Sequence, residues 1–568
     1  MKKTCGKHAL RALGLLVTFW FLPGLSLATT ARMLTDEQLI TSSRVILLGE
    51  VKSIQSQWDT HHQNIFTYVK VEVSNVLKGR LSGRSIVFKQ LGGEIGEDVT
   101  VIFGAPSYKA GQRLLLFLNS SPEGALRIAH LFQGKFDVLE DVASGSTRVE
   151  RKYDREAIHL LAAQQSGEIS TSESLDQFTK KIRRTLRKQA AAASFYEQKY
   201  ASTPIVEIPP EYNDEAKPAS GDIRPQFTFL GSGFRWFEPD SGQAVFYRVN
   251  PNGAPTGDGV SEVDTAMAAW TNVATSSITL FRGGFTSAVG FRSDGVSAIS
   301  YNDPLNQMDD PVGCSGTLAI GGFPRATTSQ TRFVNGRVFG RILEGDVVFN
   351  RFFECFLGDP TNLAEVACHE LGHTIGFDHS TLTSAPPGTD PTMRAFVYGN
   401  GRGARLGMDD VTGATFVYPQ GGNPIDDSRY FVGFHYRDFL NREPDLGGWD
   451  FWSGNITPCG SDPECTGNKR VDVSRAFWYS SEFVQNHPGL RNPPGVTPDF
   501  DNREFVRQCY LVYLRRDPAQ DQGGWDFWTD QLNNDTANDP SGYNHLITAF
   551  LVCDEYRSRN FVSYGLDQ

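Results

Sequence analysis

The segment His369–His379 constrains this chain more than any other, because it reads His-Glu-Leu-Gly-His-Thr-Ile-Gly-Phe-Asp-His. Residues four apart lie on the same face of a helix, so His369 and His373 can present both imidazoles to one metal ion. Gly376 is the residue type that lets a helix end in a left-handed conformation, and that turn brings His379 back as a third ligand. Three imidazoles leave one tetrahedral position open, which is typical of catalytic rather than structural zinc.

Glu370 indicates which reaction the predicted metal site would catalyse. It follows the first ligand directly, so its carboxylate can reach a water molecule at the open position rather than the metal itself. There it is expected to act as a general base and then to pass the proton to the leaving amine. The predicted reaction is hydrolysis of a peptide bond without a covalent acyl-enzyme.

The residues around the motif resemble a known class of enzymes. Glu365 to Ser380 is similar to the metzincin zinc-peptidase signature, and most of all to the matrixins, the matrix metalloproteinase family. Met393 stands where that family has its Met-turn, an apolar floor beneath the zinc. The resemblance covers roughly residues 227–419 and implies an α+β catalytic domain. We expect a twisted mixed sheet, an active-site helix, and a long helix over Val260 to Ala274 packed on the sheet.

The resemblance also implies how a substrate binds. Residues 315–324 resemble the edge strand along which matrixins align a peptide by main-chain hydrogen bonds, so Thr317, Leu318 and Ala319 are the expected substrate-aligning positions. Leu406, Asp409, Asp410 and Tyr418 resemble the last helix of the catalytic domain.

Departures from the family shape the cofactor prediction. Ile320 and Val348 stand where matrixins have histidines for a second, structural zinc, so we expect one catalytic Zn²⁺. Asn350 replaces a carboxylate that the family uses for calcium, which leaves a calcium site in doubt. The family's latency cysteine is also missing, because Cys5 is the only cysteine before the catalytic region. Any inhibition by the N-terminal region would therefore need steric cover or another ligand.

The N-terminus predicts export. A positively charged start is followed by an apolar stretch from about Leu13 to Leu27, and Ser26-Leu27-Ala28 offers the small residues of a cleavage site after Ala28. The alternative is an uncleaved membrane anchor. After cleavage we expect a secreted, extracellular protein, periplasmic in transit and not integral to the membrane. The net charge of -11 provides no basic field that would attract nucleic acid.

The region before the peptidase is predicted to be mostly β-structure. Short apolar or alternating runs between residues 35 and 141 favour a small antiparallel barrel, OB-like, or a sandwich. A helix follows with Leu175, Phe178, Ile182 and Leu186 as one apolar stripe, and its other face is strongly basic. That face is either simply solvated or a processing site for a trypsin-like protease, and cutting near Arg184 to Lys188 would then raise activity. A Pro-rich linker over 204–225 ends the region.

The C-terminal region contains a repeat. Residues 431–444 match 505–518, and each copy continues into Gly-Gly-Trp-Asp-Phe-Trp, at Gly447 and Gly523. The unit resembles a helical domain-of-unknown-function family of secreted bacterial proteins, so we expect an all-α tail. Its aromatic residues are expected to form a core; the alternative is a binding surface for cell-surface glycan or another protein.

The cysteines are expected to form three disulfides. Cys509 and Cys553 replace His435 and Ser480 of the first copy, and this paired gain predicts a Cys509–Cys553 bond. Cys459 and Cys465 lie six apart in one loop and are expected to close it. Cys314–Cys355 is the third predicted pair, which leaves Cys368 as the only thiol of the mature chain.

These predictions combine into a multidomain secreted zinc endopeptidase that acts on a protein or peptide substrate. The alternatives are a catalytically silent adhesin or cell-surface binding protein on the same fold, and a maturation enzyme with one target. The expected domain order is a signal peptide (1–28), a β-rich domain (29–150), the basic helix and linker (151–225), the peptidase (226–420), and helical repeats one (428–500) and two (501–568).

Overall fold

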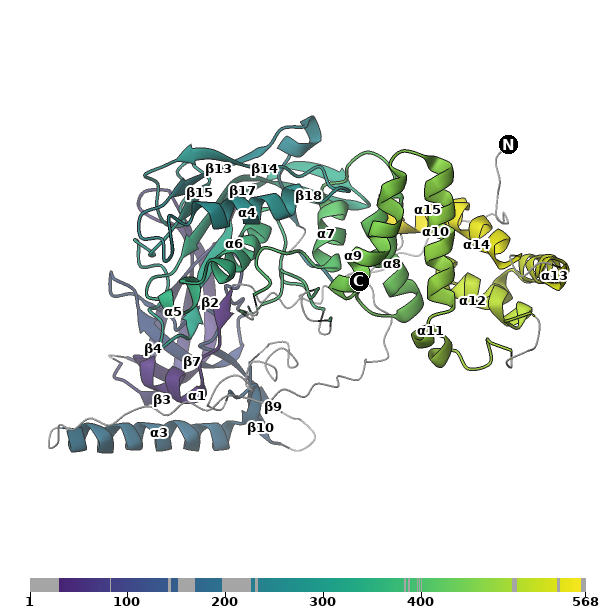
Figure 1. Cartoon of the computed structure of the whole chain (residues 1–568). Coiled ribbons are helices and arrows are strands. Elements are labelled where there is room, and N and C mark those ends of the chain that lie inside the picture. The colour runs from purple at the N-terminus through teal and green to yellow at the C-terminus, as the bar shows by residue number, and fades with distance from the viewer. Residues whose placement is uncertain are drawn as a thin grey trace.

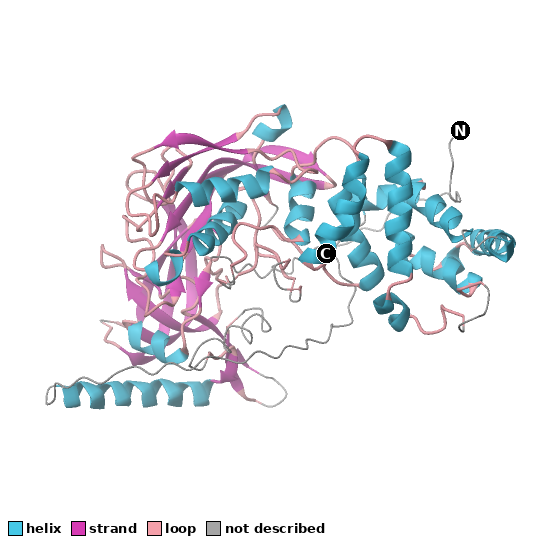
Figure 2. Cartoon of the chain, in the orientation of Figure 1, coloured by secondary structure: helices cyan, strands magenta, loops and turns pink. Residues whose placement is uncertain are grey.

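We describe the chain from a computed structural model, in which a strand-rich body adjoins a helical region (Figures 1 and 2). The structure describes residues 30–81, 83–140, 145–151, 169–196, 226–229, 233–382, 385–386, 389–395, 397, 399, 401–492, 498–538 and 542–562. The expected signal peptide and the expected linker over 204–225 lie outside these residues.

The N-terminal region is built on a closed ring of five strands. The ring runs β2–β3–β4–β8–β7 and back to β2, with only β4 and β8 parallel. A ring of this kind is a barrel rather than a two-layer sandwich. The strands are β2 (Val45–Trp58), β3 (Ile65–Lys78), β4 (Ser85–Leu91), β7 (Arg113–Ser120) and β8 (Leu126–Ile128). The predicted strand runs all lie within them.

Three strands and two helices complete this region. They are β9 (Lys135–Glu140), β10 (Thr147–Glu150), β11 (Ser172–Ser174), α1 (Asp36–Ser42) and α3 (Leu175–Tyr196). The predicted apolar stripe of α3 faces the barrel. Its residues Phe178 and Ile182 are fully buried in a core that they share with the barrel strands. Arg183, Arg184, Arg187 and Lys188 are exposed on its other face.

A mixed sheet forms the framework of the predicted catalytic region. Its strands run in the order β14-β13-β15-β18-β17-β6-β5, and the short β12 (Phe234–Arg235) also pairs with β18. From the catalytic region come β13 (Val245–Asn250), β14 (Leu280–Phe285), β15 (Ala298–Ser300), β17 (Ala319–Val334) and β18 (Arg337–Phe349). The helices α4 (Val260–Thr271) and α6 (Pro360–Thr374) pack together, and the Trp270 indole donates to the Cys368 carbonyl of α6 at 2.9 Å.

The last two strands of that sheet come from the N-terminal region, which the sequence did not predict. β5 (Gly93–Ile95) and β6 (Asp98–Ile102) lie between β4 and β7 of the barrel in the chain. β6 pairs antiparallel with β17, with Gly322 opposite Ile102 and Phe323 opposite Val101. An edge strand presents unpaired N–H and C=O groups, and β6 satisfies them. The two regions are therefore joined through one sheet.

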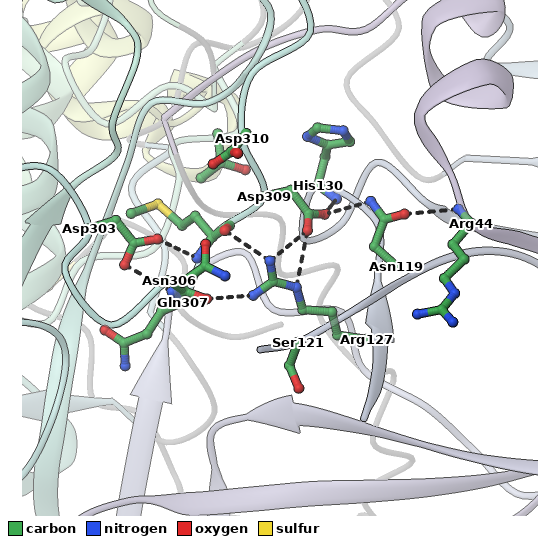
Figure 3. A network of polar contacts seen from close by, with 12 residues as sticks. Arg44, Asn119, Ser121, Arg127, His130, Asp303, Asn306, Gln307, Asp309 and Asp310 are labelled. Atoms are coloured by element: carbon green, nitrogen blue, oxygen red, sulfur yellow. Dashed lines mark hydrogen bonds and ion pairs between the residues drawn. The ribbon is translucent and has the colours of Figure 1, made fainter. Parts of the chain in front are cut away.

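A polar cluster holds the same two regions together (Figure 3). Asp309 accepts hydrogen bonds from the Arg127 guanidinium at 2.7 and 3.0 Å and from the His130 backbone N–H at 2.6 Å. Arg127 also donates to the carbonyls of Asn306 and Met308. Ionised groups make the stronger hydrogen bonds in proteins, so this cluster is a firm contact between the barrel and the catalytic region.

The tail is all-α, as predicted, and both copies have the same helix order. Copy one consists of α8 (Ser428–Leu440), α9 (Leu446–Ile456), α10 (Pro463–Trp478) and α11 (Ser481–Asn486), and copy two of α12 (Asn502–Leu514), α13 (Gln522–Asn538), α14 (Gly542–Val552) and α15 (Asp554–Val562). Asn441 and Arg515, at equivalent positions, both end a helix with positive φ (49° and 55°). One hydrophobic core spans both copies and includes Met408, so the copies are not separate packing units. Within the described part of the chain, none of the helices is both long and apolar enough to cross a membrane.

Two of the three predicted disulfides are present, Cys314–Cys355 and Cys459–Cys465. The predicted Cys509–Cys553 bond is wrong, because both residues retain thiols. The Cys553 sulfur accepts the Tyr556 backbone N–H at 3.4 Å, as the Ser480 hydroxyl accepts that of Phe483 at 3.2 Å in copy one. Cys509 is fully buried in the core. Each cysteine thus replaces a residue with its own structural role, so their joint presence in copy two is no sign of a bond.

We predict that the chain from residue 29 onward contains three titratable thiols rather than one. Cys368, Cys509 and Cys553 are all buried, so they should react with a thiol reagent only after unfolding. Reagent titration of the unreduced protein in guanidinium checks the count. Detection of a single reactive thiol would instead support the Cys509–Cys553 disulfide.

We also predict that acid weakens the contact around His130. Its ring is 1% exposed, neither ring nitrogen has a hydrogen-bond partner among the described residues, and burial lowers its pKa below the ordinary value. Arg127 lowers that pKa further, while Asp309 and Asp310 raise it. Because the unfolded state binds the proton at higher pH, stability is complete above about pH 6.5 and falls on acidification, by at most about 1.4 kcal/mol per pH unit.

Denaturant unfolding at several pH values measures this effect. His130→Asn removes the titrating group and tolerates the positive φ of 48°, so it should flatten the slope below pH 6.5. His62→Asn is the matched control, because His62 has a φ of 53° and an exposed side chain. Equal slopes for wild type and His130→Asn would contradict the prediction.

Candidate metal centre

The helix α6 is shaped to carry the motif in a dry environment. The Asp359 side chain caps its start by accepting the Thr361 N–H at 2.7 Å, and Pro360 occupies the first helical position. Every residue from Leu363 to Thr374 is buried. His369, Glu370 and His373 therefore lie on a helix enclosed by protein.

The structure brings the three predicted histidine ligands together. The Nε2 atom of His369 lies 2.9 Å from that of His373 and 3.0 Å from that of His379. In the described part of the chain, these residues form the single group of histidine, cysteine or acidic side chains arranged to hold a metal ion. They come from the end of α6 and from the turn after it.

Two backbone carbonyls fix which ring nitrogens face each other. The Nδ1 atom of His369 lies 2.6 Å from the Thr392 carbonyl, and that of His373 lies 2.7 Å from the Phe377 carbonyl. A carbonyl only accepts, so each Nδ1 carries the proton and each Nε2 presents a lone pair. Lone pairs 2.9 Å apart repel unless a cation lies between them. The donor set thus fits a zinc ion, which takes imidazole nitrogens at about 2.0–2.1 Å.

Burial keeps these imidazoles in the form that binds metal. It lowers the pKa of His369 to about 4 and holds the pKa values of His373 and His379 well below the ordinary value. All three rings are therefore neutral at neutral pH, and neutral imidazole is the ligand form.

A tight turn after α6 delivers the third histidine. Gly376 has a φ of 106°, and a Cβ atom there would lie 2.1 Å from the Phe234 carbonyl oxygen. Beyond the turn, Asp378 donates its N–H to the Thr228 carbonyl at 2.9 Å, and the Thr228 hydroxyl donates to the His379 carbonyl at 2.6 Å. A glycine is needed here both for its conformation and for its lack of a side chain.

Met393 packs against Gly372 of the motif helix. A Cβ atom on Gly372 would lie 2.2 Å from the Met393 sulfur, so the glycine allows this close approach. Asp410 holds the loop in place by accepting the N–H groups of Thr392 at 2.6 Å and Met393 at 3.1 Å. Burial raises the pKa of Asp410 to about 7. Asp410 belongs to α7 (Met408–Val417), the predicted last helix, and its position in the sequence gives no sign of this positioning role.

Glu370 is completely buried beside the histidines, and burial raises the pKa of its carboxyl to about 7. Its Oε1 atom accepts hydrogen bonds from the Thr30 hydroxyl and, at 3.2 Å, from the Thr30 backbone N–H. Gly321 leaves room for the glutamate, since a Cβ atom there would lie 2.8 Å from Oε2. No pattern in the sequence indicated Thr30, which is 340 residues away in the chain.

The predicted substrate-aligning residues are also in contact with the N-terminus. β1 (Ala31–Arg32) pairs antiparallel with β16 (Gly316–Thr317), and Leu318 donates its N–H to the Thr30 carbonyl at 2.9 Å. Ala319 begins β17 and pairs with Phe349 on the other side. Phe103 stacks on the His373 ring, with centroids 4.6 Å apart and planes 8° apart. Phe103, like Thr30, had no signal in the sequence.

The residues at the positions where matrixins bind a second zinc ion and calcium make other contacts in this chain. Ile320 and Val348 lie opposite each other on β17 and β18 and are both buried in an apolar cluster. The Asn350 side chain donates to the carbonyls of Thr317 and Asp309 at 2.7 and 2.9 Å. The Asp346 carboxylate accepts the backbone N–H groups of Arg292 and Ala298.

Comparison with solved structures finds 22 similar chains. The chain is similar to high choriolytic enzyme 1 (HCE-1), a hatching enzyme zinc-protease from Oryzias latipes (Medaka fish), at 15% identity and a TM-score of 0.18. The likeness covers 32% of this chain and 94% of that chain. No protein-family model and no curated protein sequence matches the chain. Values of this size do not assign the chain to a family.

We predict that Gly376→Ala weakens metal binding about 10–100-fold, as the loss of supporting contacts does at other metal sites. The added methyl group would collide with the Phe234 carbonyl and displace the turn that carries His379. Zinc titration against a competing chelator measures the affinity. Gly401→Ala is the control, because Gly401 also has a positive φ (81°) but has no other atoms within 4 Å of an added Cβ. Equal affinities for the two variants would contradict the role of this turn.

Proposed function

We propose that this chain is a secreted zinc-dependent endopeptidase of the metzincin type, with a matrixin-like catalytic region. The observation that carries the proposal is the convergence of three neutral imidazole Nε2 atoms beside the carboxylate of Glu370. His369, His373 and His379 would hold one zinc ion. When bound, zinc polarises a carbonyl and lowers the pKa of a water molecule to about 7.

The residues of the chain then have distinct tasks. Glu370 holds a proton at its carboxylate oxygen and passes it to the amine that leaves. The backbone of Thr317, Leu318 and Ala319 orients the peptide as an added strand. Met393 packs beneath the histidines without binding the metal.

Secretion and the nature of the partners belong to the same proposal. Two disulfides are consistent with an oxidising compartment, where such bonds persist. The substrate is a protein or peptide, and the tail is where contact with a cell surface or glycan would occur. In support of such contact, Phe451 and Phe527 occupy the same position in the two copies and are 61% and 54% exposed.

A Glu370→Ala variant tests the proposal. Zinc content by plasma emission spectroscopy should stay near one ion per chain, while hydrolysis of a denatured protein substrate should fall by at least about 10². Glu354→Ala, on the exposed face of the neighbouring α5 (Glu354–Leu357), is the control and should keep full activity. Because Thr30 is hydrogen-bonded to the Glu370 carboxylate, the assay should include protein exposed to limited proteolysis as well as the intact chain.

The results separate the proposal from its alternatives. If the wild type binds zinc but cleaves nothing in a broad peptide library, with or without limited proteolysis, the silent-adhesin alternative replaces the peptidase. A zinc content near two per chain would refute the single-zinc expectation. Cleavage of a single narrow sequence would indicate a maturation enzyme with one target.

A further inference from the structure

The edge strand next to the metal centre is paired with the N-terminal region on both sides of Ala319–Ile320. On one side of Leu318–Ile320, β1 pairs with β16 at Gly316–Thr317. On the other side, β6 pairs with β17 from Gly322 to Thr327. An edge strand has one free row of hydrogen-bonding groups, so a peptide cannot pair with the same residues while β1 and β6 are in place.

The first of these strands also contacts the proposed general base. The Thr30 carbonyl accepts the Leu318 N–H, and the Thr30 hydroxyl and N–H both donate to Glu370. Thr30 therefore directs an amide nitrogen at the carboxylate that would serve a leaving amine. Ala31 and Met33 are fully buried in a cluster with Phe132, and the Leu34 N–H donates to the Gln133 side chain at 2.8 Å. The segment is anchored on the barrel as well as on the catalytic region.

The second strand also helps to cover the metal centre. It leads into Phe103, which lies flat against His373 and is 1% exposed. Together the two strands leave His369, Glu370 and His373 with no exposed surface at all. The barrel holds both strands, because β1 precedes its first strand and β6 lies between two of its strands.

The Asp309 cluster fixes the barrel in this position (Figure 3). Four hydrogen bonds reach Asp309 from Arg127, His130 and Asn119, all on the barrel side. The Asp309 and Arg127 side chains are only 8% and 16% exposed, so little water competes for these bonds. Arg127 lowers the pKa of Asp309, which keeps the carboxylate ionised.

We propose that the N-terminal region is a built-in inhibitor of the peptidase, which blocks the substrate path by adding two strands and engages Glu370 through Thr30. This inference rests on the proposed function. Among the described residues, the N-terminal region adds no histidine, cysteine or acidic side chain to the group of three histidines. The proposed inhibition therefore does not need the latency cysteine of the matrixins. Activation requires the barrel to separate from the catalytic region.

This inference changes what a cut near Arg184 to Lys188 would do. Such a cut falls within α3, beyond the last strand of the barrel, and leaves β1, β6 and the Asp309 cluster intact. A nick alone therefore keeps the site covered, and activity follows only when the two pieces come apart.

The test weakens the cluster in the full-length chain. Arg127→Ala removes the four hydrogen bonds of this side chain to Asp309 and to the neighbouring carbonyls. Losing charge-assisted bonds should raise the population of the open state about tenfold or more, and the rate of peptide hydrolysis in proportion. Arg113→Ala is the matched control, because Arg113 pairs with Glu140 inside the N-terminal region. Thr30→Val is a second variant, which removes only the hydroxyl contact to Glu370, and Thr41→Val in α1 is its control.

Hydrogen exchange in the metal-free protein gives a readout that does not depend on activity. The Leu318 amide should exchange faster in Arg127→Ala than in wild type or Arg113→Ala. If wild type and both variants hydrolyse peptides equally fast and protect this amide equally, the inhibitor inference is overturned while the peptidase stands. If Arg127→Ala exchanges faster and binds zinc but hydrolyses nothing, the cover is supported and the proposed peptidase fails.

Discussion

The candidate metal centre depends on one electrostatic constraint, the packing of three neutral imidazoles around a shared point in a dry interior. Burial keeps the rings uncharged, and the carbonyls of Thr392 and Phe377 hold the Nδ1 protons of two of them. Each carbonyl sits in a loop that needs its own support. Asp410 fixes the loop of Thr392, and the glycine turn at Gly376 fixes that of Phe377. The metal site thus depends on contacts made well outside the motif.

The short-range parts of this arrangement are readable in the sequence. The spacing of His369, His373 and His379 follows from helix geometry, so the sequence predicts that they converge. Gly376 indicates the turn, because a side chain there would collide with the Phe234 carbonyl. The apolar stripe of α3 and the repeated helices of the tail are equally local patterns. In each case, residues a few positions apart determine the feature, so one sequence contains enough information.

The parts that the sequence could not supply are contacts between distant segments. Thr30 meets Glu370 across 340 residues, and β6 leaves the barrel to complete another sheet. Neither segment differs in composition from an ordinary strand or loop, so nothing marks its partner. The prediction of a Cys509–Cys553 bond is wrong for a different reason. Two cysteines gained in one copy looked coupled, but Cys553 caps a helix and Cys509 fills a core, and these roles are independent.

The edge of β17 explains why the N-terminal barrel and the region of the metal centre share a sheet. A catalytic cleft that reads peptides by strand addition must keep one edge unpaired, and an unpaired edge binds any suitable strand, including one from another molecule. Covering the edge with β1 and β6 removes that hazard. Because both strands belong to one barrel, they hold or leave the edge together. The strands that protect the edge from wrong pairing are therefore the same ones that cover Glu370.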